Sequence, residues 1–597
     1  MDEENTILKL QKEIERLKKA VKKQRYGLVW MDVPEAFEND VENKIPILKE
    51  VPELAIKNDN RKPTHILIEG DNYHALTCLN YTHKGKIDVI YIDPPYNTGS
   101  DGFRYKDKRI IDKFPDGTEV PKFHPFRHSY WLSFMRKRLE LARDLLKESG
   151  VIIISIDDNE LAQLMLLCNE IFSLPTKSKN YQDNFIGNII RNTNSTKNQS
   201  NFLSITHDYT LFYAKNINFL NEKLKLEDRK WEVLKNNVSE YKRQIKILQD
   251  KGLSNEVLTN ELKELTKYPR FIDFTNYWYI DERGVYMKDN LGGVENGNIE
   301  PIINPLTDKP DPTPPGGFRY DSKKLKELIK ENRIHFHTDG SLPRLKRYLD
   351  ENMKQRPKGI MSDDQRPDYN LLKSMGIKFD NPKTLAFMER TLSIFEDDSI
   401  VLDFFAGSGT TAHAVLNLNE IDKGTRQFIM ITNNEDNICT EVCYPRIKNI
   451  INGWKSKINN ESIKGVGNSV KYYRTAFIGK NNIINATDED KVELAHNAGE
   501  LLAIAENTLE LVKQNGYYQL FEDSGKEKCT TVYFREELDK FEEFAEMVKK
   551  LKKKTTVYVF SWGNEEFSDD FAYLKDVRVK TIPQPILEIY KNIYNLW

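Results

Sequence analysis

The chain has 597 residues, of which 39% are hydrophobic and 30% are charged, and its formal net charge is −2. This balance is typical of a large globular protein and excludes a uniformly basic nucleic-acid binder, although a local basic surface is compatible with it. Five scattered cysteines exclude a secreted disulfide framework, and no second zinc-ligand pair accompanies Cys439 and Cys443, so no metal is expected. Because the chain has neither a signal-peptide pattern nor an apolar run of about 18 to 20 residues, we expect a cytoplasmic protein without a membrane partner.

An amino-terminal helix is predicted over residues 4–24. Five apolar residues recur there at spacings of three and four: Ile7, Leu10, Ile14, Leu17 and Val21. This spacing fits a short amphipathic helix packed on its own body, and it equally fits a coiled coil that pairs two chains. Residues 1–30 are therefore assigned to an amino-terminal helix, which packs either on its own chain or on a second chain.

Strand and helix patterns alternate from residue 64 onward. A helix through Tyr81 can be capped by Asp71 or Asn72, and a second helix over Tyr130–Lys147 is expected to stop near Gly150. The strands between these helices are apolar runs typical of parallel strands buried on both faces. The predicted strands are Thr64–Ile68, Ile87–Ile92 and Val151–Ile156. This order implies a doubly wound α/β sheet.

The middle of the chain has a different pattern. Apolar spacing predicts a helix over residues 231–248, which begins at Trp231, and a second helix over Asn255–Thr266, which Ser254 can cap. Glycine and proline are frequent in residues 292–317, which are expected to be mostly loop.

The strand–helix pattern resumes near residue 380. A strand over Ile400–Phe404, a glycine-rich turn, a helix over Thr411–Leu418 and a strand over Phe428–Thr432 are expected. The tail then reads as a smaller α/β domain. Its predicted helices and strands are Val492–Lys513, Glu536–Leu551, Thr555–Ser561 and Val577–Ile582.

Asp93, Pro94, Pro95 and Tyr96 directly follow the predicted strand Ile87–Ile92. Ligands of open α/β sheets bind outside the carboxyl ends of the strands, so this turn is placed for a site. Asp93 and the Pro94 carbonyl can accept the two hydrogens of an exocyclic amine, and Tyr96 can stack on a planar base. The alternative is a plain turn that ends a strand.

The stretch from Asp403 to Thr411, DFFAGSGTT, separates a predicted strand from a predicted helix. Gly407 and Gly409 let the backbone approach a ligand closely, and a helix amino terminus favours a negative group such as a carboxylate. The stretch is neither the GxGxxG fingerprint nor a Walker loop. A tight strand–helix turn that needs small residues is the alternative interpretation.

The two motifs in this order resemble those of the S-adenosylmethionine-dependent amino-methyltransferases of DNA, which carry D/N/S-P-P-Y/W/F and F-x-G-x-G. Here the first motif precedes the second by about 310 residues, an order that resembles the β class of these enzymes. Within that class, the chain most resembles the modification (Mod) subunits of type III restriction-modification systems, over roughly residues 64–460. One departure is Phe404, where many relatives carry proline.

This resemblance implies a Rossmann-like methyltransferase core that binds S-adenosyl-L-methionine. Asp71 would meet the adenine of this cofactor, residues 379–384 (FDNPKT) would close over its methionine end, and Glu435 would hold its ribose hydroxyls. The catalytic residues would be Asp93, Pro94, Pro95 and Tyr96. The cofactor-binding residues would be Asp71, Asn72, Lys383, Thr384, Asp403, Phe405, Gly407, Gly409 and Glu435.

The resemblance also implies a domain order and partners. The amino-terminal helix (1–30) would precede the catalytic half of the core (31–175), a target-recognition region (176–375), the cofactor half of the core (376–460) and a small α/β domain (461–597). The protein would act as a homodimer on double-stranded DNA and could join a separate ATP-dependent helicase-nuclease subunit. The chain itself has no Walker motif, so restriction would reside in that partner.

DNA would contact the segment between the two motifs. Residues 171–380 contain 35 Lys and Arg against 29 Asp and Glu, a net of about +6 in a nearly neutral chain. Any one of these side chains is equally compatible with an ordinary polar surface. The candidate DNA contacts are Arg191, Lys197, Arg344, Lys346, Arg347, Lys354 and Arg356.

The expected reaction is methylation of the N6 amine of a flipped adenine in duplex DNA. Cytosine N4 is the nearest alternative, because the same constellation methylates it, although that class more often carries Ser at the position of Asp93. An RNA or protein amine, a solitary methyltransferase without a restriction partner, and an inactive DNA-specificity subunit remain further alternatives.

Overall fold

The computed structural model describes residues 30, 44–58, 61–98, 107–110, 113, 118–121, 124–175, 181–192, 203, 205–362, 365–479, 488–534, 538–560, 567–583 and 586–587. The predicted helix over residues 4–24 and the candidate Lys197 lie outside these ranges. The chain divides into two units. One comprises Met1–Ile190, Lys197–Arg229 and Gln365–Trp597, and the other comprises Arg191–Thr196 and Lys230–Asp364.

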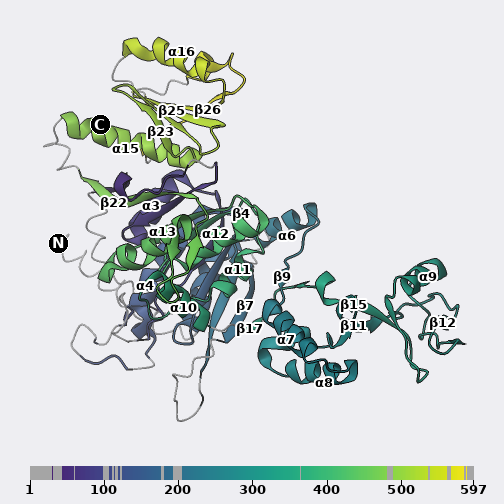
Figure 1. Cartoon of the computed structure of the whole chain (residues 1–597). Helices are drawn as coiled ribbons and strands as arrows, with labels where there is room; N and C mark the ends of the chain where they lie inside the picture. Colours follow the sequence, from purple (N-terminus) through teal and green to yellow (C-terminus); the bar gives the residue numbers. More distant parts are fainter. Residues whose placement is uncertain are drawn as a thin grey trace, which may run out of the picture. The chain divides into compact units, whose positions relative to one another are not determined.

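A large sheet forms the centre of the first unit (Figure 1). In spatial order its strands include β1 (Lys44–Glu50), β22 (Ser469–Gly479), β2 (Thr64–Glu69), β19 (Gln427–Thr432), β18 (Ile400–Asp403), β3 (Ile87–Ile92), β4 (Leu146–Ile156), β8 (His207–Ala214) and β7 (Phe185–Asn192). The strands from β22 to β4 run parallel, whereas β1 runs antiparallel to β22 and β8 runs antiparallel to β4. The predicted α/β class with a largely parallel sheet is therefore confirmed.

Helices of this unit pack on the sheet through a shared core. Trp131, Ile90 and Leu402 are fully buried in one cluster that joins helix and strand residues. Among the helices of the described ranges, none combines the length and apolar character needed to cross a bilayer. The helices around this sheet are α3 (Asn72–Thr82), α4 (Ser129–Leu145), α5 (Leu161–Phe172), α6 (Ile217–Leu226), α10 (Arg366–Met375), α11 (Leu385–Leu392), α12 (Thr410–Asp422) and α13 (Tyr444–Asn452).

A second sheet lies at the carboxyl-terminal end of the same unit. Its strand order is β23 (Glu510–Gln514), β24 (Tyr518–Glu522), β25 (Lys528–Phe534), β26 (Lys554–Phe560) and β27 (Val577–Val579). The accompanying helices are α15 (Asp488–Glu506), α16 (Phe541–Leu551) and α17 (Ser568–Phe571). Leu501, Phe534 and Phe560 belong to the same core cluster as the large sheet, so hydrophobic packing is continuous between the two sheets.

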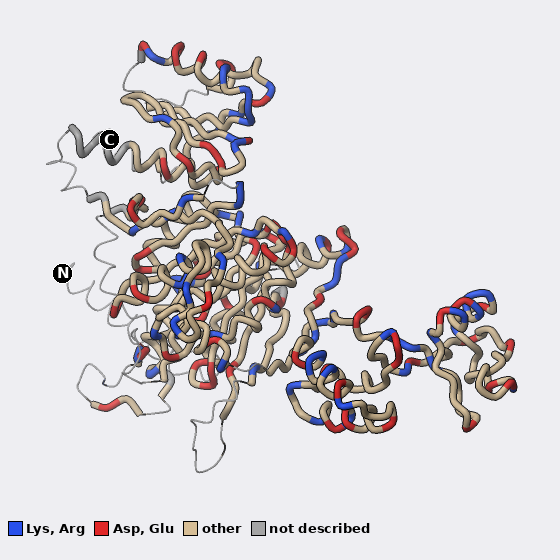
Figure 2. The backbone as a smooth tube through the Cα atoms, in the orientation of Figure 1, with Lys and Arg blue, Asp and Glu red and all other residues tan. Residues whose placement is uncertain are grey.

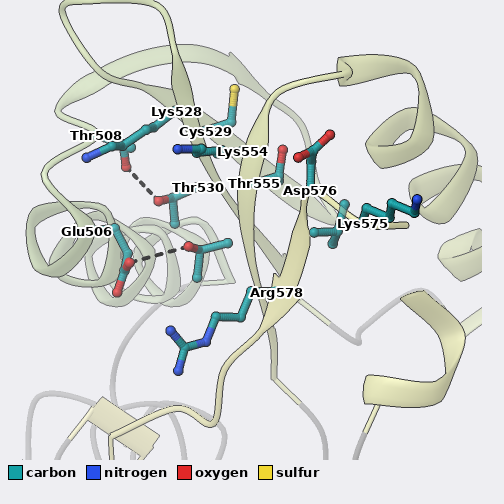
Figure 3. Close-up of a pocket in the computed structure, with 12 residues that line it drawn as sticks. Glu506, Thr508, Lys528, Cys529, Thr530, Lys554, Thr555, Lys575, Asp576 and Arg578 are labelled. Carbon is teal, nitrogen blue, oxygen red and sulfur yellow. Dashed lines mark hydrogen bonds between the residues drawn. The ribbon is translucent and has the colours of Figure 1, made fainter. Parts of the chain in front are cut away.

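One cavity of about 330 Å³ opens at the first residues of β25, β26 and β27. Its lining includes the cations Lys528, Lys554, Lys575 and Arg578 and the acid Asp576. Figure 3 shows that Lys575 points away from Lys528 and Lys554, so these cations do not converge on one point. Glu506, which also lines the cavity, already binds Tyr558 at 2.8 Å and Lys580 at 2.7 Å.

The second unit contains a helical hairpin and a small sheet. The helices of the hairpin are α7 (Val238–Asp250) and α8 (Asn255–Leu265), and the sheet has the order β10 (Tyr279–Asp281), β11 (Gly284–Asn290), β15 (Arg344–Tyr348) and β14 (Ile334–His335). A separate helix, α9 (Ser322–Lys330), packs with a second core cluster. The short strands of the unit are β9 (Val233–Leu234), β12 (Ile303–Asn304), β13 (Lys309–Pro310), β16 (Lys354–Gln355) and β17 (Ile360–Ser362).

Three predicted elements differ from the structure. The helix predicted from Trp231 begins at Val238, because Asn237 adopts a left-handed conformation with φ of 57°. The helix predicted through Lys513 ends at Glu506, where Asn507 also has a positive φ, and β23 follows. Gly150 does not stop α4 but lies inside β4, where a Cβ would come within 2.9 Å of the Lys147 carbonyl oxygen.

The extents of the predicted domains also differ from the two units. Residues of the predicted recognition region between 205 and 229, which include β8 and α6, belong to the first unit. β22 falls within residues 461–597, yet it is a strand of the large sheet and pairs with β1 and β2.

Candidate active site

Four neighbouring strands bring predicted site residues to one edge of the large sheet. β2, β19, β18 and β3 are adjacent and parallel, so their carboxyl ends meet at that edge. Asp71 follows β2, Glu435 lies just beyond β19, Asp403 ends β18 and Asp93 follows β3. The two motifs, which are far apart in the sequence, therefore come from neighbouring strands of the sheet.

The turn from Asp93 to Tyr96 is fixed against α4. The Tyr96 hydroxyl donates a hydrogen bond to Asp93 Oδ1 at 2.8 Å. The buried indole N–H of Trp131, on α4, donates to the Pro95 carbonyl at 2.8 Å. Pro94 and Pro95 are buried, whereas Asp93 and Tyr96 are half-buried. The turn thus holds a carboxylate and an aromatic ring at a partly open position.

Lys383 lies in the same cluster. Its Nζ donates to the Tyr96 hydroxyl at 2.5 Å, and it lies 3.1 Å from Asp93 Oδ1 and 2.9 Å from Asp208 Oδ2. Lys383 was predicted to bind the cofactor, and the structure places it beside the carboxylate of Asp93, which was predicted to be catalytic. The side chain of Lys383 is only 10% exposed, so its charge is compensated chiefly by these carboxylates.

Asp208 is a residue that the sequence analysis missed. It lies at the start of β8, which runs antiparallel to β4, with Tyr209 opposite Ile156. Because of this direction, the first residues of β8 lie at the carboxyl end of β4, the edge where Asp93 lies. A carboxylate at the start of an otherwise buried strand was the available signal.

A second buried cluster fixes the chain that follows Tyr96. Asn97, with φ of 59°, donates from Nδ2 to Glu160 Oε1 at 2.6 Å, and His128 Nδ1 lies 2.7 Å from the same oxygen. Asn97 Oδ1 accepts from the Arg109 backbone N–H at 2.7 Å. Burial raises the pKa of Glu160, and its contact with His128 opposes this shift. Sequence reasoning missed this cluster, because its members lie far apart along the chain.

The buried side chain of Asp403 binds both ends of the glycine-rich turn. Its carboxylate accepts from the Phe405 N–H at 2.9 Å and from the Thr411 hydroxyl at 2.5 Å, and only 2% of the residue is exposed. Burial raises its pKa to about 7, the two hydrogen bonds lower it, and the charge of Asp93 raises it further. Asp403 therefore stabilises the conformation of the turn through its side-chain hydrogen bonds.

The glycines of this turn have left-handed backbone conformations. Gly407 and Gly409 have φ of 51° and 75°, and Gly409 caps the amino terminus of α12. Behind the turn, the buried guanidinium of Arg446 donates to the hydroxyls of Ser408 at 3.0 Å and Thr410 at 2.8 Å. Burial lowers the pKa of Arg446 to about 10. Arg446 is a further residue that sequence reasoning missed.

Asp71 and Asn72 join the start of α3 to the site. The Asp71 carboxylate accepts from the Tyr73 N–H at 2.8 Å and so caps α3, as predicted. Asn72 donates to the Phe404 carbonyl at 3.0 Å, and its Oδ1 accepts from the buried guanidinium of Arg138 at 2.5 Å. The carboxylate of Asp71 remains 40% exposed and can meet a ligand.

The residues at this edge fit S-adenosyl-L-methionine. An exposed carboxylate of Glu435 at the end of β19 suits paired ribose hydroxyls, and the half-exposed Asp71 suits an amine. The positive φ of Gly407 and Gly409 leaves the backbone before α12 open to close approach by a carboxylate. Thr384, also predicted at this site, is 2% exposed and occupies the N-cap position of α11.

The candidate DNA contacts within the described residues differ in how exposed their side chains are. Arg191 and Lys346 are only 3% and 6% exposed, and Lys346 binds Asp281 at 2.8 Å, which favours a structural role for both. Arg347 pairs with Asp289 at 2.5 Å and is partly open, Arg344 is half-buried, and Arg356 is exposed with Lys354. Figure 2 shows Lys and Arg interspersed with Asp and Glu over the second unit.

Comparison with known families gives one match that covers the site. The family model described as "DNA methylase" (N6_N4_Mtase) matches residues 87–441. That range begins at β3 and includes the Asp93 turn, the second unit, the glycine-rich turn and Glu435.

Individual relatives extend this comparison. The EcoP15I Mod subunit of a type III restriction-modification enzyme from Escherichia coli is 34% identical over 68% of this chain and 64% of the relative. The StyLTI Mod subunit from Salmonella typhimurium is 32% identical over 63% of this chain and 53% of the relative. The chain thus spans less than two thirds of the length of either relative. Among solved structures, the M1.HpyAVI–SAM complex is 14% identical with a TM-score of 0.26, over 64% of this chain and 96% of that one.

Proposed function

The chain belongs to the DNA methylase family, and from this premise we propose that it transfers a methyl group from S-adenosyl-L-methionine to the N6 amine of adenine in duplex DNA. The observation that carries the proposal is the arrangement of Asp93 and Tyr96 next to the glycine-rich turn of Asp403, at the ends of the paired strands β3 and β18. A hydrogen-bond acceptor for an amine and a candidate cofactor-binding turn thus lie at one edge of the sheet. The core is then Rossmann-like.

The chain's own groups would bind and orient the base. A base inside the double helix cannot reach a site at a sheet edge, so the adenine must flip out, and the Tyr96 ring replaces stacking that is lost. The amine is a weak nucleophile, because its lone pair is delocalised into the ring. Hydrogen bonds from the amine to Asp93 and to the Pro94 carbonyl favour a tetrahedral nitrogen with a directed lone pair. These acceptors gain strength as positive charge develops on that nitrogen.

The contacts of Asp93 agree with this role. Both the Tyr96 hydroxyl and Lys383 contact Oδ1, and no contact among the described residues uses Oδ2. Oδ2 is thus the oxygen that accepts a hydrogen of the amine and then receives its proton once the nitrogen has become cationic. When bound, S-adenosyl-L-methionine supplies an electrophilic methyl group on a sulfonium. Asp71, Glu435 and the turn at Gly407 and Gly409 would hold it.

Adenine is favoured over cytosine by Asp93, because DNA methyltransferases that act on cytosine N4 more often carry serine at this position. The partners we propose are double-stranded DNA, a second copy of the chain and a helicase-nuclease restriction subunit. Their support is the similarity to proteins named as Mod subunits of type III restriction-modification enzymes. Arg344, Arg347, Lys354 and Arg356 are the candidates for DNA contact that the structure leaves accessible.

The direct test uses purified protein and unmethylated bacterial DNA with S-adenosyl-L-methionine. The DNA is digested to nucleosides and analysed by mass spectrometry, with Asp93→Asn as the matched variant. N6-methyldeoxyadenosine that depends on Asp93 supports the proposal. Detection of N4-methyldeoxycytidine instead would identify cytosine as the methylated base. Binding of the cofactor without any modified nucleoside contradicts methyl transfer to DNA by this chain alone.

A further inference from the structure

The contact between Asp208 and Lys383 bears on how the site works. Lys383 Nζ has three partners at hydrogen-bond distance, namely the Tyr96 hydroxyl, Asp93 Oδ1 and Asp208 Oδ2. The ammonium donates hydrogen bonds to the Tyr96 hydroxyl and to Asp208, and it forms an ion pair with Asp93. Asp208 has a side chain that is 7% exposed and Lys383 one that is 10% exposed, so water screens the pair poorly.

The charges of this cluster are unequal. It contains one ammonium, on Lys383, and two carboxylates, on Asp93 and Asp208. When all three are ionised, the Lys383 ammonium is shared between the two carboxylates, so Asp93 is not fully neutralised by it. Without Asp208, Lys383 and Asp93 would neutralise each other. A neutralised Asp93 is a poorer acceptor for an amine hydrogen and stabilises less positive charge on the amine nitrogen.

We propose that Asp208 is a positioning residue of methyl transfer, which binds the Lys383 ammonium and so preserves the negative charge of Asp93 for the amine. This inference rests on the proposed function, and it holds whether the amine belongs to adenine or to cytosine. Asp208 does not touch the base. It acts through Lys383, and through the Tyr96 hydroxyl, which lies 3.5 Å from Asp208 Oδ2.

The position of Asp208 in the fold supports this role. Its backbone belongs to β8, which pairs with β4 from the next residue, Tyr209, to Ala214 and ends in buried residues, so the carboxylate projects from a regular strand. Lys383, in contrast, lies in the segment before α11, outside any helix or strand. A fixed carboxylate that holds a cation from a less regular segment is the arrangement expected of an anchor.

The test is a double-mutant cycle with purified protein, unmethylated DNA and S-adenosyl-L-methionine. Asp208→Asn should lower kcat by about ten- to a hundredfold, with little change in the Kd of S-adenosyl-L-methionine, because the loss concerns charge in the transition state. Adding Lys383→Gln removes the cation that Asp208 held. The double variant should therefore be at least several-fold faster than Asp208→Asn and should equal Lys383→Gln alone.

Two further variants exclude a merely structural effect. Glu50→Gln removes the half-buried carboxylate of another ion pair in the same unit, with the buried Lys471 Nζ 2.8 Å from Glu50 Oε1, and should leave kcat unchanged. Asp208→Glu keeps the charge and should be more active than Asp208→Asn. This variant tests the role of the charge even if Asp208→Asn folds poorly.

The outcomes separate the two proposals. If the wild-type protein modifies no DNA, the proposed function fails. If the wild-type protein is active and Asp208→Asn has the same kcat, only the inference about Asp208 is overturned. It is equally overturned if the double variant loses the product of the two single losses, because Asp208 would then act independently of Lys383.

Discussion

Asn72 donates a hydrogen bond from its side-chain amide to the carbonyl of Phe404 at 3.0 Å, across 332 residues of sequence. The bond joins the start of α3 to the turn after β18. The Oδ1 of the same side chain accepts from Arg138, so the turn is tied to the interior of α4 as well. The two halves of the predicted cofactor site are thus held in register by one amide.

Replacing Asn72 by alanine should therefore weaken cofactor binding. The variant leaves the Phe404 carbonyl without this donor, a loss of about 1 to 3 kcal/mol for a buried group. We expect the Kd of S-adenosyl-L-methionine to rise about tenfold, which corresponds to ~1.4 kcal/mol. Isothermal titration calorimetry measures it. The control is Asn80→Ala on the same helix, where the amide binds the Leu76 and Leu141 carbonyls instead. An equal rise in Kd for both variants would contradict a specific role for Asn72.

The raised pKa of Asp403 predicts how stability depends on pH. In the unfolded chain its pKa is about 4, whereas burial raises it to about 7 in the folded protein. Between these values the folded state holds a proton that the unfolded state has lost, so Asp403 destabilises the fold progressively as pH rises through this window. Above pH 7 the cost is complete, and below pH 4 it is absent.

Asp403→Asn carries no such proton, so its melting temperature relative to wild type should rise between pH 4 and pH 7 and then level off. Differential scanning calorimetry across this range measures the difference, and other titrating groups cancel in it. A difference that is independent of pH would show that Asp403 does not titrate in this window.

The Glu160 cluster should matter for catalysis more than for cofactor binding. Glu160→Gln keeps the shape but weakens the contacts with Asn97 and His128 that fix the chain after Tyr96. We expect kcat to fall about tenfold through misplacement of the catalytic turn, with the Kd of S-adenosyl-L-methionine unchanged. Glu170→Gln, which breaks an exposed pair with Arg136 at 3.0 Å, is the control and should alter neither quantity. A kcat of Glu160→Gln equal to that of wild type would show that this cluster does not position the turn for catalysis.

Gly409 should tolerate no side chain without cost to the cofactor site. Gly409→Ala places a Cβ 3.2 Å from Cys443 Sγ in a residue with φ of 75°. Gly85→Ala meets a similar φ of 68° with nothing within 4 Å, so it shows the backbone cost alone, about 1 to 2 kcal/mol. Both variants should melt earlier than wild type, and Gly409→Ala should in addition bind S-adenosyl-L-methionine more weakly, as thermal shift with added cofactor measures. If cofactor raises both melting temperatures equally, the turn at Gly409 does not hold it.

Elements with a strong local signal could be predicted from the sequence. β3 was predicted with its observed bounds, because its residues form an apolar run broken only by Asp88, which is typical of a strand buried on both faces. The cap at Asp71 and the helix after the glycine-rich turn follow from residue types that local backbone geometry requires.

Features that depend on distant residues could not be predicted in this way. Asp208 joins the site only because β8 is antiparallel to β4, and no local pattern fixes that direction. Arg138 and Arg446 are buried arginines whose sequence context resembles that of surface residues. The start of α7 was misplaced because Trp231 and Leu234 extend the apolar spacing of the helix, while the left-handed Asn237 interrupts its backbone.

The central claim is site-specific methylation of DNA that depends on Asp93. The most direct measurement is to express the protein in a bacterial host without its own DNA methylation and to sequence the genome by a method that detects modified bases. N6-methyladenine is expected at one short recurring sequence, and this modification should disappear in Asp93→Asn. An unmodified genome from cells that contain the folded, cofactor-binding protein would contradict methylation of DNA by this chain.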